Sequence, residues 1–185
     1  MIDKKTLKSQ MLAKRNQLEN KAEKSQAICQ KILDSKVFAN AKNVFLFLSF
    51  GSEVNTSLLV KYCFDQGKKV CVPVCKKDGI MDAVYINCFD DMVCNKYGIK
   101  EPVDVTKVAD RQDIDLIIVP GSVFDKNLNR IGYGKGYYDR YFVGTIAKRV
   151  AVAFDCQVID QQLPVGEYDV KMHCIVTEKQ ILGEL

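Results

Sequence analysis

The sequence predicts an α/β protein, a three-layer α/β/α sandwich around a mostly parallel sheet, with a helical N-terminal extension. The continuous apolar run 44–50 has the pattern of a strand buried on both faces, 114–119 is predicted to be another buried strand, and 149–154 is predicted to be a further strand. Helical patterns lie between the strands, which indicates parallel strands joined by crossover connections. The chain contains no internal repeat, low-complexity segment or linker, so we expect one domain over residues 1–185.

Two helices are predicted at the start of the chain. Residues 4–19 place Leu7 and Met11 at a helical interval, with lysines between them. Asn20 followed by Glu23 is typical of a capping-box variant, which would start a second helix. We therefore expect this region to form the helical extension and the first helix that follows it.

Strands and helices alternate along the rest of the chain. Gly67 lies where a helix stop is expected, and the polar stretch 87–112 contains a predicted turn, "YGIKEP". After the second helix, which ends near Leu33, the predicted elements are strand 44–50, helix 56–64, strand 69–74, strand 81–86, strand 114–119, a helix starting at 137–142, strand 149–154 and strand 174–177.

The composition excludes several classes of protein. Hydrophobic residues make up 48% of the 185 residues and charged residues 27%, which is typical of soluble globular proteins. The net charge of +4 is a modest bias, unlike the concentrated basic face of a nucleic-acid-binding protein. The longest apolar runs fall far short of the roughly 20 residues of a membrane span. The N-terminus lacks the apolar core of a secretory signal, so we expect a cytoplasmic protein.

The eight cysteines are scattered and form no C-x-x-C pair, which argues against a disulfide scaffold or a metal site. Several lie in apolar runs, where a free cysteine behaves as a small hydrophobe. We expect reduced structural thiols in a reducing compartment. The single histidine, His173, cannot build a zinc site by itself, and we interpret it as a loop or strand-edge residue.

The stretch "RIGYGKGYYDRY" (130–141) carries three glycines at alternate positions. It is neither a P-loop nor a dinucleotide fingerprint, because the required spacings are missing. The physics of a phosphate site is nevertheless present. Glycines let backbone N–H groups converge on an anion, Arg130 and Lys135 add positive charge, and a helix N-terminus near Gly136 would point at the same spot.

Carboxylates near this loop suggest a divalent cation. Asp139 would lie in the first turn of the helix, and a carboxylate close to phosphates is tolerable when a cation lies between them. The alternative is a mobile turn in which Asp139 only favours the helix dipole. Asp169 precedes the last predicted strand and could pair with Asp139 or be a turn residue. Glu53 follows the first apolar run, where ligands bind in open α/β sheets, although it could simply cap the next helix.

These residues together resemble the signature of the 5-formyltetrahydrofolate cyclo-ligase family, also called 5,10-methenyltetrahydrofolate synthetases. The family pattern is Pro-Gly, then Phe-Asp, then Asn-Arg-hydrophobic-Gly-x-Gly-x-Gly-Tyr-Tyr-Asp, and all of it is present from Pro120 to Asp139. The resemblance covers essentially the whole chain, since it extends to "FLSFGSEVNT" (47–56), "MDAVYI" (81–86), "GIKEP" (98–102) and "LPVGEYDVKMH" (163–173).

The resemblance implies an enzyme that converts 5-formyltetrahydrofolate to 5,10-methenyltetrahydrofolate with ATP and Mg²⁺. In the family's scheme the formyl oxygen attacks the γ-phosphate of ATP, N10 attacks the resulting iminium phosphate, and phosphate leaves as the ring closes. Such phosphoryl transfer needs positioning and charge neutralisation more than a protein nucleophile.

The resemblance also implies a role for individual residues. The expected ATP-binding residues are Lys4, Lys8, Arg130, Ile131, Gly132, Tyr133, Gly134, Lys135, Gly136, Tyr137 and Tyr138. The expected folate-binding residues are Leu48, Glu53, Met81, Tyr133, Gly134, Lys135, Gly136 and Tyr137, and the expected magnesium ligands are Asp139 and Asp169. Without the resemblance, the basic N-terminal helix is typical of a solvated face; with it, the helix becomes a partial lid over ATP.

The chain departs from the family pattern at three positions. Lys8 stands where the family usually has arginine, so a point charge replaces a bidentate phosphate contact. Tyr97 lies near a position where some members have tryptophan, and it would preserve an aromatic wall. His173 replaces an aspartate that is not clearly a ligand.

Two other functions are compatible with the same residues. One is a non-catalytic folate-binding protein that kept the fold, and the other is a related ATP-dependent enzyme acting on another formyl or carboxylate substrate. In each case we expect small-molecule ligands, no nucleic-acid or membrane partner, and a monomer.

Overall fold

A seven-stranded sheet forms the centre of the computed structural model, which describes residues 3–95 and 98–185. Its strands are β1 (Asn43–Leu46), β2 (Lys69–Cys75), β3 (Met81–Ile86), β6 (Leu116–Val119), β9 (Lys148–Val152), β11 (Cys174–Val176) and β12 (Ile181–Gly183). The strand order is β12-β11-β9-β6-β1-β2-β3. The five central strands are parallel, and only β12 and β3 pair antiparallel at the two edges, which confirms the predicted mostly parallel sheet.

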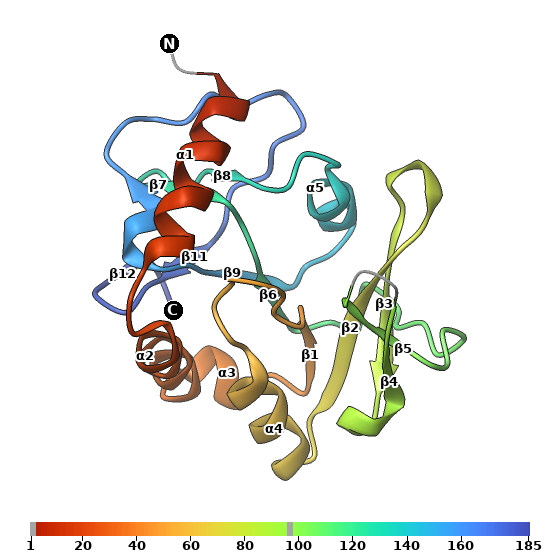
Figure 1. The fold of residues 1–185 in the computed structure, drawn as a ribbon. Helices are drawn as coiled ribbons and strands as arrows, with labels where there is room; N and C mark the ends of the chain where they lie inside the picture. The colour runs from red at the N-terminus through yellow and green to blue at the C-terminus, as the bar shows by residue number, and fades with distance from the viewer. Residues whose placement is uncertain (1–2, 96–97) are drawn as a thin grey trace.

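Helices cover both faces of this sheet (Figure 1). They are α1 (Lys4–Gln17), α2 (Lys21–Leu33), α3 (Lys36–Asn40), α4 (Ser57–Asp65) and α5 (Tyr137–Phe142), with short 3₁₀ turns at Lys77–Gly79, Phe89–Asp91 and Asp155–Gln157. In Figure 1, α2, α3 and α4 lie below the sheet, whereas α1 and α5 lie above it. The predicted layers are therefore present, and the upper layer is completed by loops.

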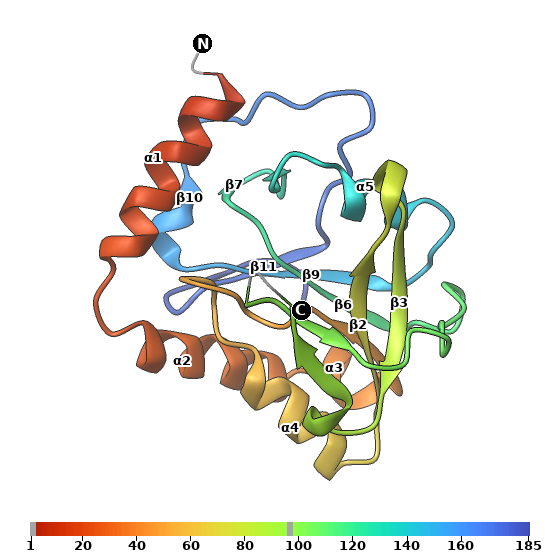
Figure 2. The same ribbon diagram turned by 45° about the vertical axis from the view of Figure 1, so that its right-hand side comes forward.

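Two small sheets were not predicted. One is formed by β7 (Val123–Asp125), β8 (Arg130–Ile131) and β10 (Val158–Ile159), and the other by β4 (Met92–Cys94) and β5 (Lys100–Pro102). Figure 2 shows α1 lying beside β10 and β7. Leu7 and Met11 of α1 are buried there in a cluster with Val123, Ile131 and Leu163. The N-terminal helix is thus held against the sheet segment that leads into the glycine-rich loop.

The alternation of side chains explains why the central strands are continuously apolar. In β1, Val44 and Leu46 enter the core shared with α2, α3 and α4, whereas Phe45 enters the core shared with α5. In β6, Ile117 and its neighbour Ile118 likewise belong to opposite cores. A strand that is buried on both faces needs apolar residues at every position.

The apolar run 44–50 was predicted to be strand throughout, but β1 ends at Leu46. Phe47 remains buried, yet its carbonyl accepts a hydrogen bond from Thr56 Oγ1 (2.7 Å) instead of a strand neighbour. Gly51 then turns the chain with a φ of 60°. Residues 47–53 therefore leave the sheet at the carboxyl end of β1 and become available to line a site.

The predicted capping box at Asn20 is wrong, although α2 does begin at Lys21. Asn20 has left-handed backbone torsions (φ 54°), and its side chain makes no capping hydrogen bond. A capping side chain requires extended backbone at this position, which Asn20 lacks.

The predicted turn over 97–102 is also replaced in part, because Lys100–Pro102 pairs with β4 as a strand. Helix α3 and strand β12 were not predicted.

The cysteines are all free thiols. Cys29, Cys63, Cys71 and Cys174 are buried, and the loss of solvation raises the pKa of each; those of Cys29, Cys63 and Cys71 rise to about 12. Across residues 3–95 and 98–185, no helix combines the length and the apolar character needed to cross a bilayer.

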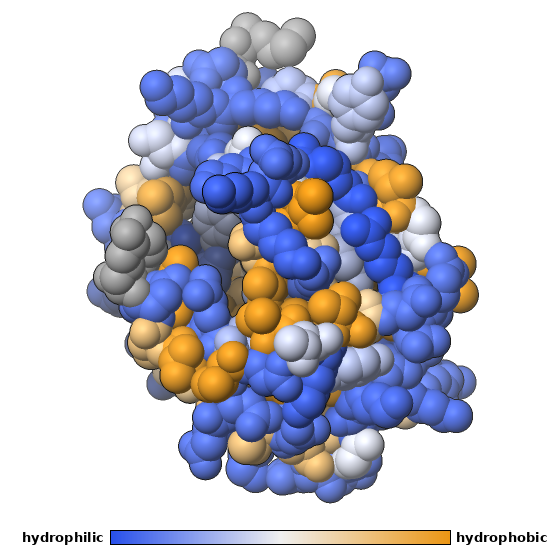
Figure 3. All heavy atoms as spheres, turned by 90° about the vertical axis from the view of Figure 1, so that its right-hand side faces the viewer, coloured by the Kyte–Doolittle hydropathy of each residue, from blue (hydrophilic) through white to orange (hydrophobic). Residues whose placement is uncertain are grey.

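The side of the molecule around β3, β4 and β5 exposes several apolar side chains. Val93, Val103, Val105 and Val108 are all exposed there. Figure 3 looks onto this side and shows apolar side chains gathered on it around a hollowed surface. This face borders the β2–β3 hairpin, which packs against the glycine-rich loop described below.

We predict that Phe45→Ala lowers the free energy of unfolding by about 3–5 kcal/mol, because a buried aromatic ring is replaced by a cavity. The Phe45 ring is fully buried, with its centroid 5.0 Å from that of Tyr141 and 6.2 Å from that of Tyr138. Urea unfolding measures the change. Ile146→Ala is the matched control, since Ile146 is 82% exposed, and it should change the value by less than about 0.5 kcal/mol.

Candidate active site

The glycine-rich loop, residues 132–136, connects β8 to α5. Gly134 and Gly136 have φ values of 101° and 64°. Gly136 is the residue before α5, and glycine adopts this positive φ without the strain that a Cβ introduces, so it favours the start of the helix here. Ile131, the last residue of β8, is buried beneath α1. Helix, loop and strand are therefore fixed relative to one another.

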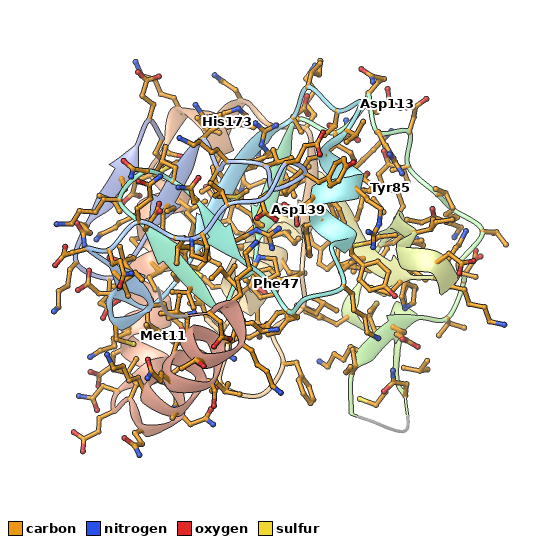
Figure 4. The ribbon with its side chains drawn as sticks, turned by 90° about the horizontal axis from the view of Figure 1, so that it is seen from above. Met11, Phe47, Tyr85, Asp113, Asp139 and His173 are labelled. Atoms are coloured by element: carbon orange, nitrogen blue, oxygen red, sulfur yellow. The ribbon has the colours of Figure 1, made fainter. Side chains whose placement is uncertain are left out.

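A buried ion pair lies directly under this loop. Arg130 is 8% exposed, and its Nη2 donates to Asp139 Oδ2 at 3.0 Å, while Nη1 donates to the carbonyl of Pro120 at 3.3 Å. A Cβ on Gly132 would lie 2.6 Å from Arg130 Nη1, so a larger residue would have to displace the guanidinium. Asp139 Oδ1 also accepts from the backbone N–H of Val170 (3.2 Å). Figure 4 shows Asp139 on α5, near the centre of the view.

The second predicted metal ligand is paired in the same way. Asp169 Oδ2 accepts from Lys4 Nζ at 2.5 Å and from the backbone N–H of Gly166 at 2.8 Å. Burial alone would raise the pKa of Asp169, but the hydrogen bonds from Gly166 and Lys4, together with the positive charge of Arg130, hold it below its usual value. Asp169 adjoins Val170, which bonds to Asp139, so the structure brings the two predicted ligands together.

These two carboxylates fit a magnesium ion whose remaining ligands are phosphate oxygens and water. Mg²⁺ is usually bound through one or two carboxylates plus phosphate oxygens and water. No cluster of three or more His, Cys, Asp or Glu residues suited to a metal is found within residues 3–95 and 98–185. Arg130 Nε is buried and makes no hydrogen bond to the described residues, so one donor of the guanidinium is unsatisfied. An all-protein metal cage is not built here.

Helix α1 approaches the loop from the other side. Lys8 Nζ donates to the carbonyl of Tyr133 at 2.8 Å, and a Cβ on Gly134 would lie 3.1 Å from the same Nζ. A hollow of about 280 Å³ separates the helix from the loop; it is lined by Lys5, Lys8, Ser9, Leu12, Arg15, Ser122 and Tyr133. The predicted lid thus corresponds to a basic helix that contacts the loop through Lys8.

Glu53 lies at the end of β1, facing the same loop. Its Oε2 accepts from the backbone N–H of Phe50 (2.9 Å), and its Oε1 accepts from the hydroxyl of Tyr133. Burial raises the pKa of Glu53, and the hydrogen bonds from Tyr133 and Phe50 and the charge of Arg15 offset only part of this effect. Burial and the adjacent Glu53 carboxylate likewise raise the pKa of Tyr133. The side chain does not cap α4, so the alternative of a simple cap for Glu53 is wrong.

Arg15 was missed by the sequence analysis. It lies in the last turn of α1 and is 5% exposed; its Nε donates to Ser52 Oγ (3.0 Å) and its Nη1 to the Tyr133 hydroxyl (3.4 Å). A signal was present: Leu7, Met11 and Arg15 recur every four residues, which places a charged residue on the buried face of the helix.

The far flank of the loop is docked on the β2–β3 turn. Tyr137 Oη donates to the carbonyl of Lys76 (3.0 Å), and Arg140 donates to the carbonyls of Gly79 (2.9 Å) and Lys135. A hollow of about 710 Å³ lies at this contact, lined by Cys75, Lys76, Lys77, Asp78, Gly79, Lys135, Tyr137 and Arg140. The predicted loop residues therefore form one surface between α1 and this hairpin.

The remaining predicted residues lie deeper. Tyr138 is the next residue after Tyr137, and its ring stacks on Phe45 in the upper core. Met81 is 2% exposed in the same core, and Leu48 is half-buried against the lower core at the end of β1. Tyr97, the predicted aromatic wall, lies outside the described residues.

His173 has a structural partner. Its Nδ1 accepts from the backbone N–H of Arg149 (2.9 Å), and its Nε2 lies 2.9 Å from Arg149 Nη2. The backbone N–H of His173 donates to the carbonyl of Arg149. Burial and the charge of Arg149 lower the pKa of His173. It is a strand-edge residue next to β11, as predicted.

Comparisons with known proteins agree on one family. Residues 1–178 match the model of the 5-formyltetrahydrofolate cyclo-ligase family. The 5-formyltetrahydrofolate cyclo-ligase of Mus musculus is 32% identical, with 86% of this chain and 85% of the relative covered, and that of Escherichia coli K12 is 30% identical, with 88% and 92% covered. The solved structure of Aquifex aeolicus 5,10-methenyltetrahydrofolate synthetase is 28% identical with a TM-score of 0.83, covering 96% of this chain and 91% of that one.

We predict that Glu53→Gln stabilises the protein at pH 8 more than at pH 5. Because the pKa of Glu53 is raised in the folded state above its usual value of 4.5, the folded protein holds this proton more tightly than the unfolded chain. The contribution of Glu53 to stability therefore falls as pH rises from about 4.5 through the folded-state pKa.

Thermal melts of both proteins at the two pH values measure this difference. Glu167→Gln, at an exposed carboxylate, is the control and should show equal changes at both pH values. A Glu53→Gln variant whose melting temperature shifts equally at pH 5 and pH 8 would contradict the assigned environment of Glu53.

Proposed function

The chain belongs to the 5-formyltetrahydrofolate cyclo-ligase family, and from that premise we propose that it converts 5-formyltetrahydrofolate to 5,10-methenyltetrahydrofolate with MgATP. ADP and phosphate are the other products, and one domain over residues 1–185 carries the reaction. One observation carries the site assignment: Tyr133 accepts a hydrogen bond from Lys8 through its carbonyl and donates one to Glu53 through its hydroxyl. The expected nucleotide and folate sides of the loop meet at this residue.

The cationic side of the loop suits the phosphates of ATP. Arg130, Lys4 and Lys8 surround the loop, and each is already held in place by an acceptor of the protein. In the proposed complex these cations and the loop N–H groups bind the phosphate oxygens, which neutralises charge as the γ-phosphoryl group moves to the formyl oxygen. Mg²⁺ held by Asp139 and Asp169 would add charge neutralisation at the same phosphates.

The acidic side of the loop suits the folate. The Glu53 carboxylate is fixed by two hydrogen bonds and lies in a partly desolvated position, where it can accept from the polar edge of the pterin. Holding the pterin there leaves the formyl group to face the phosphate side, and N10 then closes the ring as phosphate departs. In this scheme the protein supplies orientation and electrostatic stabilisation, with no covalent enzyme intermediate.

We predict that the purified protein forms the methenyl chromophore in the near ultraviolet when given 5-formyltetrahydrofolate and MgATP, with one phosphate released per product. A correctly folded protein that forms no product overturns the proposal. Folate binding without ATP consumption would instead indicate the non-catalytic alternative, and phosphate release with another formyl or carboxylate compound would indicate the other enzyme.

Two variants separate the nucleotide and metal roles. Lys8→Ala removes a single half-buried cation, so we expect the KM for ATP to rise about ten-fold with a smaller effect on the KM for folate, since a charge-assisted contact is worth about 1.5–3 kcal/mol. Asp169→Asn should raise the Mg²⁺ concentration needed for half-maximal rate. Lys14→Ala, at an exposed lysine of α1 outside the hollow between this helix and the loop, is the control for net charge. Unchanged ATP and Mg²⁺ dependence in both variants would contradict these assignments.

A further inference from the structure

Arg15 is a buried charged side chain in a helix whose other buried residues are apolar. It shares the inward face of α1 with Leu7 and Met11, at intervals of four residues. Arginine is almost never fully buried unless its charge is paired or its donors are bonded, because desolvating an ion is costly. Its presence on this face therefore requires a role for the guanidinium that packing alone does not supply.

The guanidinium faces the folate side of the proposed site. Nε donates to Ser52 Oγ (3.0 Å), in the turn that carries Glu53, and Nη1 donates to the hydroxyl of Tyr133 (3.4 Å), which in turn donates to Glu53. The charge of Arg15 also lowers the pKa of the Glu53 carboxyl. Both loops that hold Glu53 in place are thus bonded to one side chain of α1.

We propose that Arg15 is a positioning residue for folate: it orients the Tyr133 hydroxyl and the Ser52 turn so that the Glu53 carboxylate is preset for its ligand. The inference rests on the proposed function, because the orientation of Glu53 matters only if Glu53 binds the folate. If Glu53 is already ordered before folate binds, less conformational entropy is lost on binding. Removing the Arg15 contacts should therefore raise the Kd for folate.

A general role in docking α1 would have a different signature. Ser52 is also bonded to Asn16 of α1, through Ser52 Oγ to Asn16 Oδ1 at 2.6 Å, so the turn keeps one anchor to the helix without Arg15. Lys4 and Lys8, the proposed nucleotide contacts, are carried by the same helix. Undocking α1 would therefore weaken ATP binding, whereas loss of the Arg15 contacts alone would weaken folate binding.

The experiment compares Arg15→Met with the wild type. Methionine keeps a long apolar stem in the buried position and removes every donor. Calorimetry measures the Kd of 5-formyltetrahydrofolate in the absence of ATP, and steady-state kinetics give the KM for each substrate. Lys14→Met, one residue earlier on the exposed face of α1, removes the same charge from the helix and is the matched control.

We expect Arg15→Met to weaken folate binding about ten-fold, the loss that follows when a charge-assisted hydrogen-bond network is removed, with the KM for ATP changed less than about two-fold. Lys14→Met should match the wild type. Arg15→Lys keeps the charge and a single donor nitrogen but lacks the planar fork that reaches two acceptors, so its folate Kd should fall between those of the wild type and Arg15→Met.

Three results would overturn the inference: unchanged folate affinity in Arg15→Met, a parallel rise in the KM for ATP, or wild-type protein that binds no 5-formyltetrahydrofolate. Wild-type protein that binds the folate but forms no methenyl product refutes the proposed reaction and leaves the Arg15 test intact.

If Arg15→Met does not fold, Arg15→Lys and Tyr133→Phe replace it. Because Arg15 acts through the Tyr133 hydroxyl, their combined effect on folate Kd should be less than the product of the single effects, and full additivity would overturn the inference.

Discussion

The ion pair between Arg130 and Asp139 is the interaction on which the rest of the site depends. It links the strand before the glycine-rich loop to the helix after it, so the loop is closed at its base like a hairpin. Gly121 and Gly132 leave the space that the arginine side chain occupies. Breaking a buried pair leaves an unpaired charge and typically costs about 3–5 kcal/mol. Replacing Arg130 with alanine is therefore expected to lower the free energy of unfolding as well as turnover.

The site is balanced in charge before any ligand arrives. Lys4 is paired with Asp169 and Arg130 with Asp139, so two of the proposed phosphate-binding cations are each bonded to a proposed metal ligand. Binding of a metal–phosphate complex would exchange these partners without leaving a charge unpaired. The positive ion would replace the cations at the carboxylates, and the phosphates would accept the released cations. Such an exchange keeps the desolvation cost of the assembled site low.

The sequence predicts the central sheet well and the surroundings of the site less well, for physical reasons. β6 was predictable because every position of a strand buried on both faces is apolar, and β9 because its last three residues are apolar and buried. Strands of two or three residues, such as β8 and β10, are too short for a periodic pattern. The glycine spacing and its flanking charges indicated the loop, and family resemblance supplied the roles. The docking of Tyr137 on the β2–β3 turn, and of Arg15 on Tyr133, depends on tertiary contacts that no local pattern encodes.

The position of α1 has a consequence for how the chain matures during synthesis. The helix is made first, yet Lys4 pairs with Asp169, 165 residues later, and Leu7 and Met11 pack against Val123 and Leu163. A ribosome that adds about 5–20 residues per second leaves such a helix without its docking surface for many seconds. β1, β2, β3, β6 and β9 can assemble in that interval, whereas the site cannot close until the C-terminal segment has emerged. During translation, most of the central sheet can therefore form before the active site is complete.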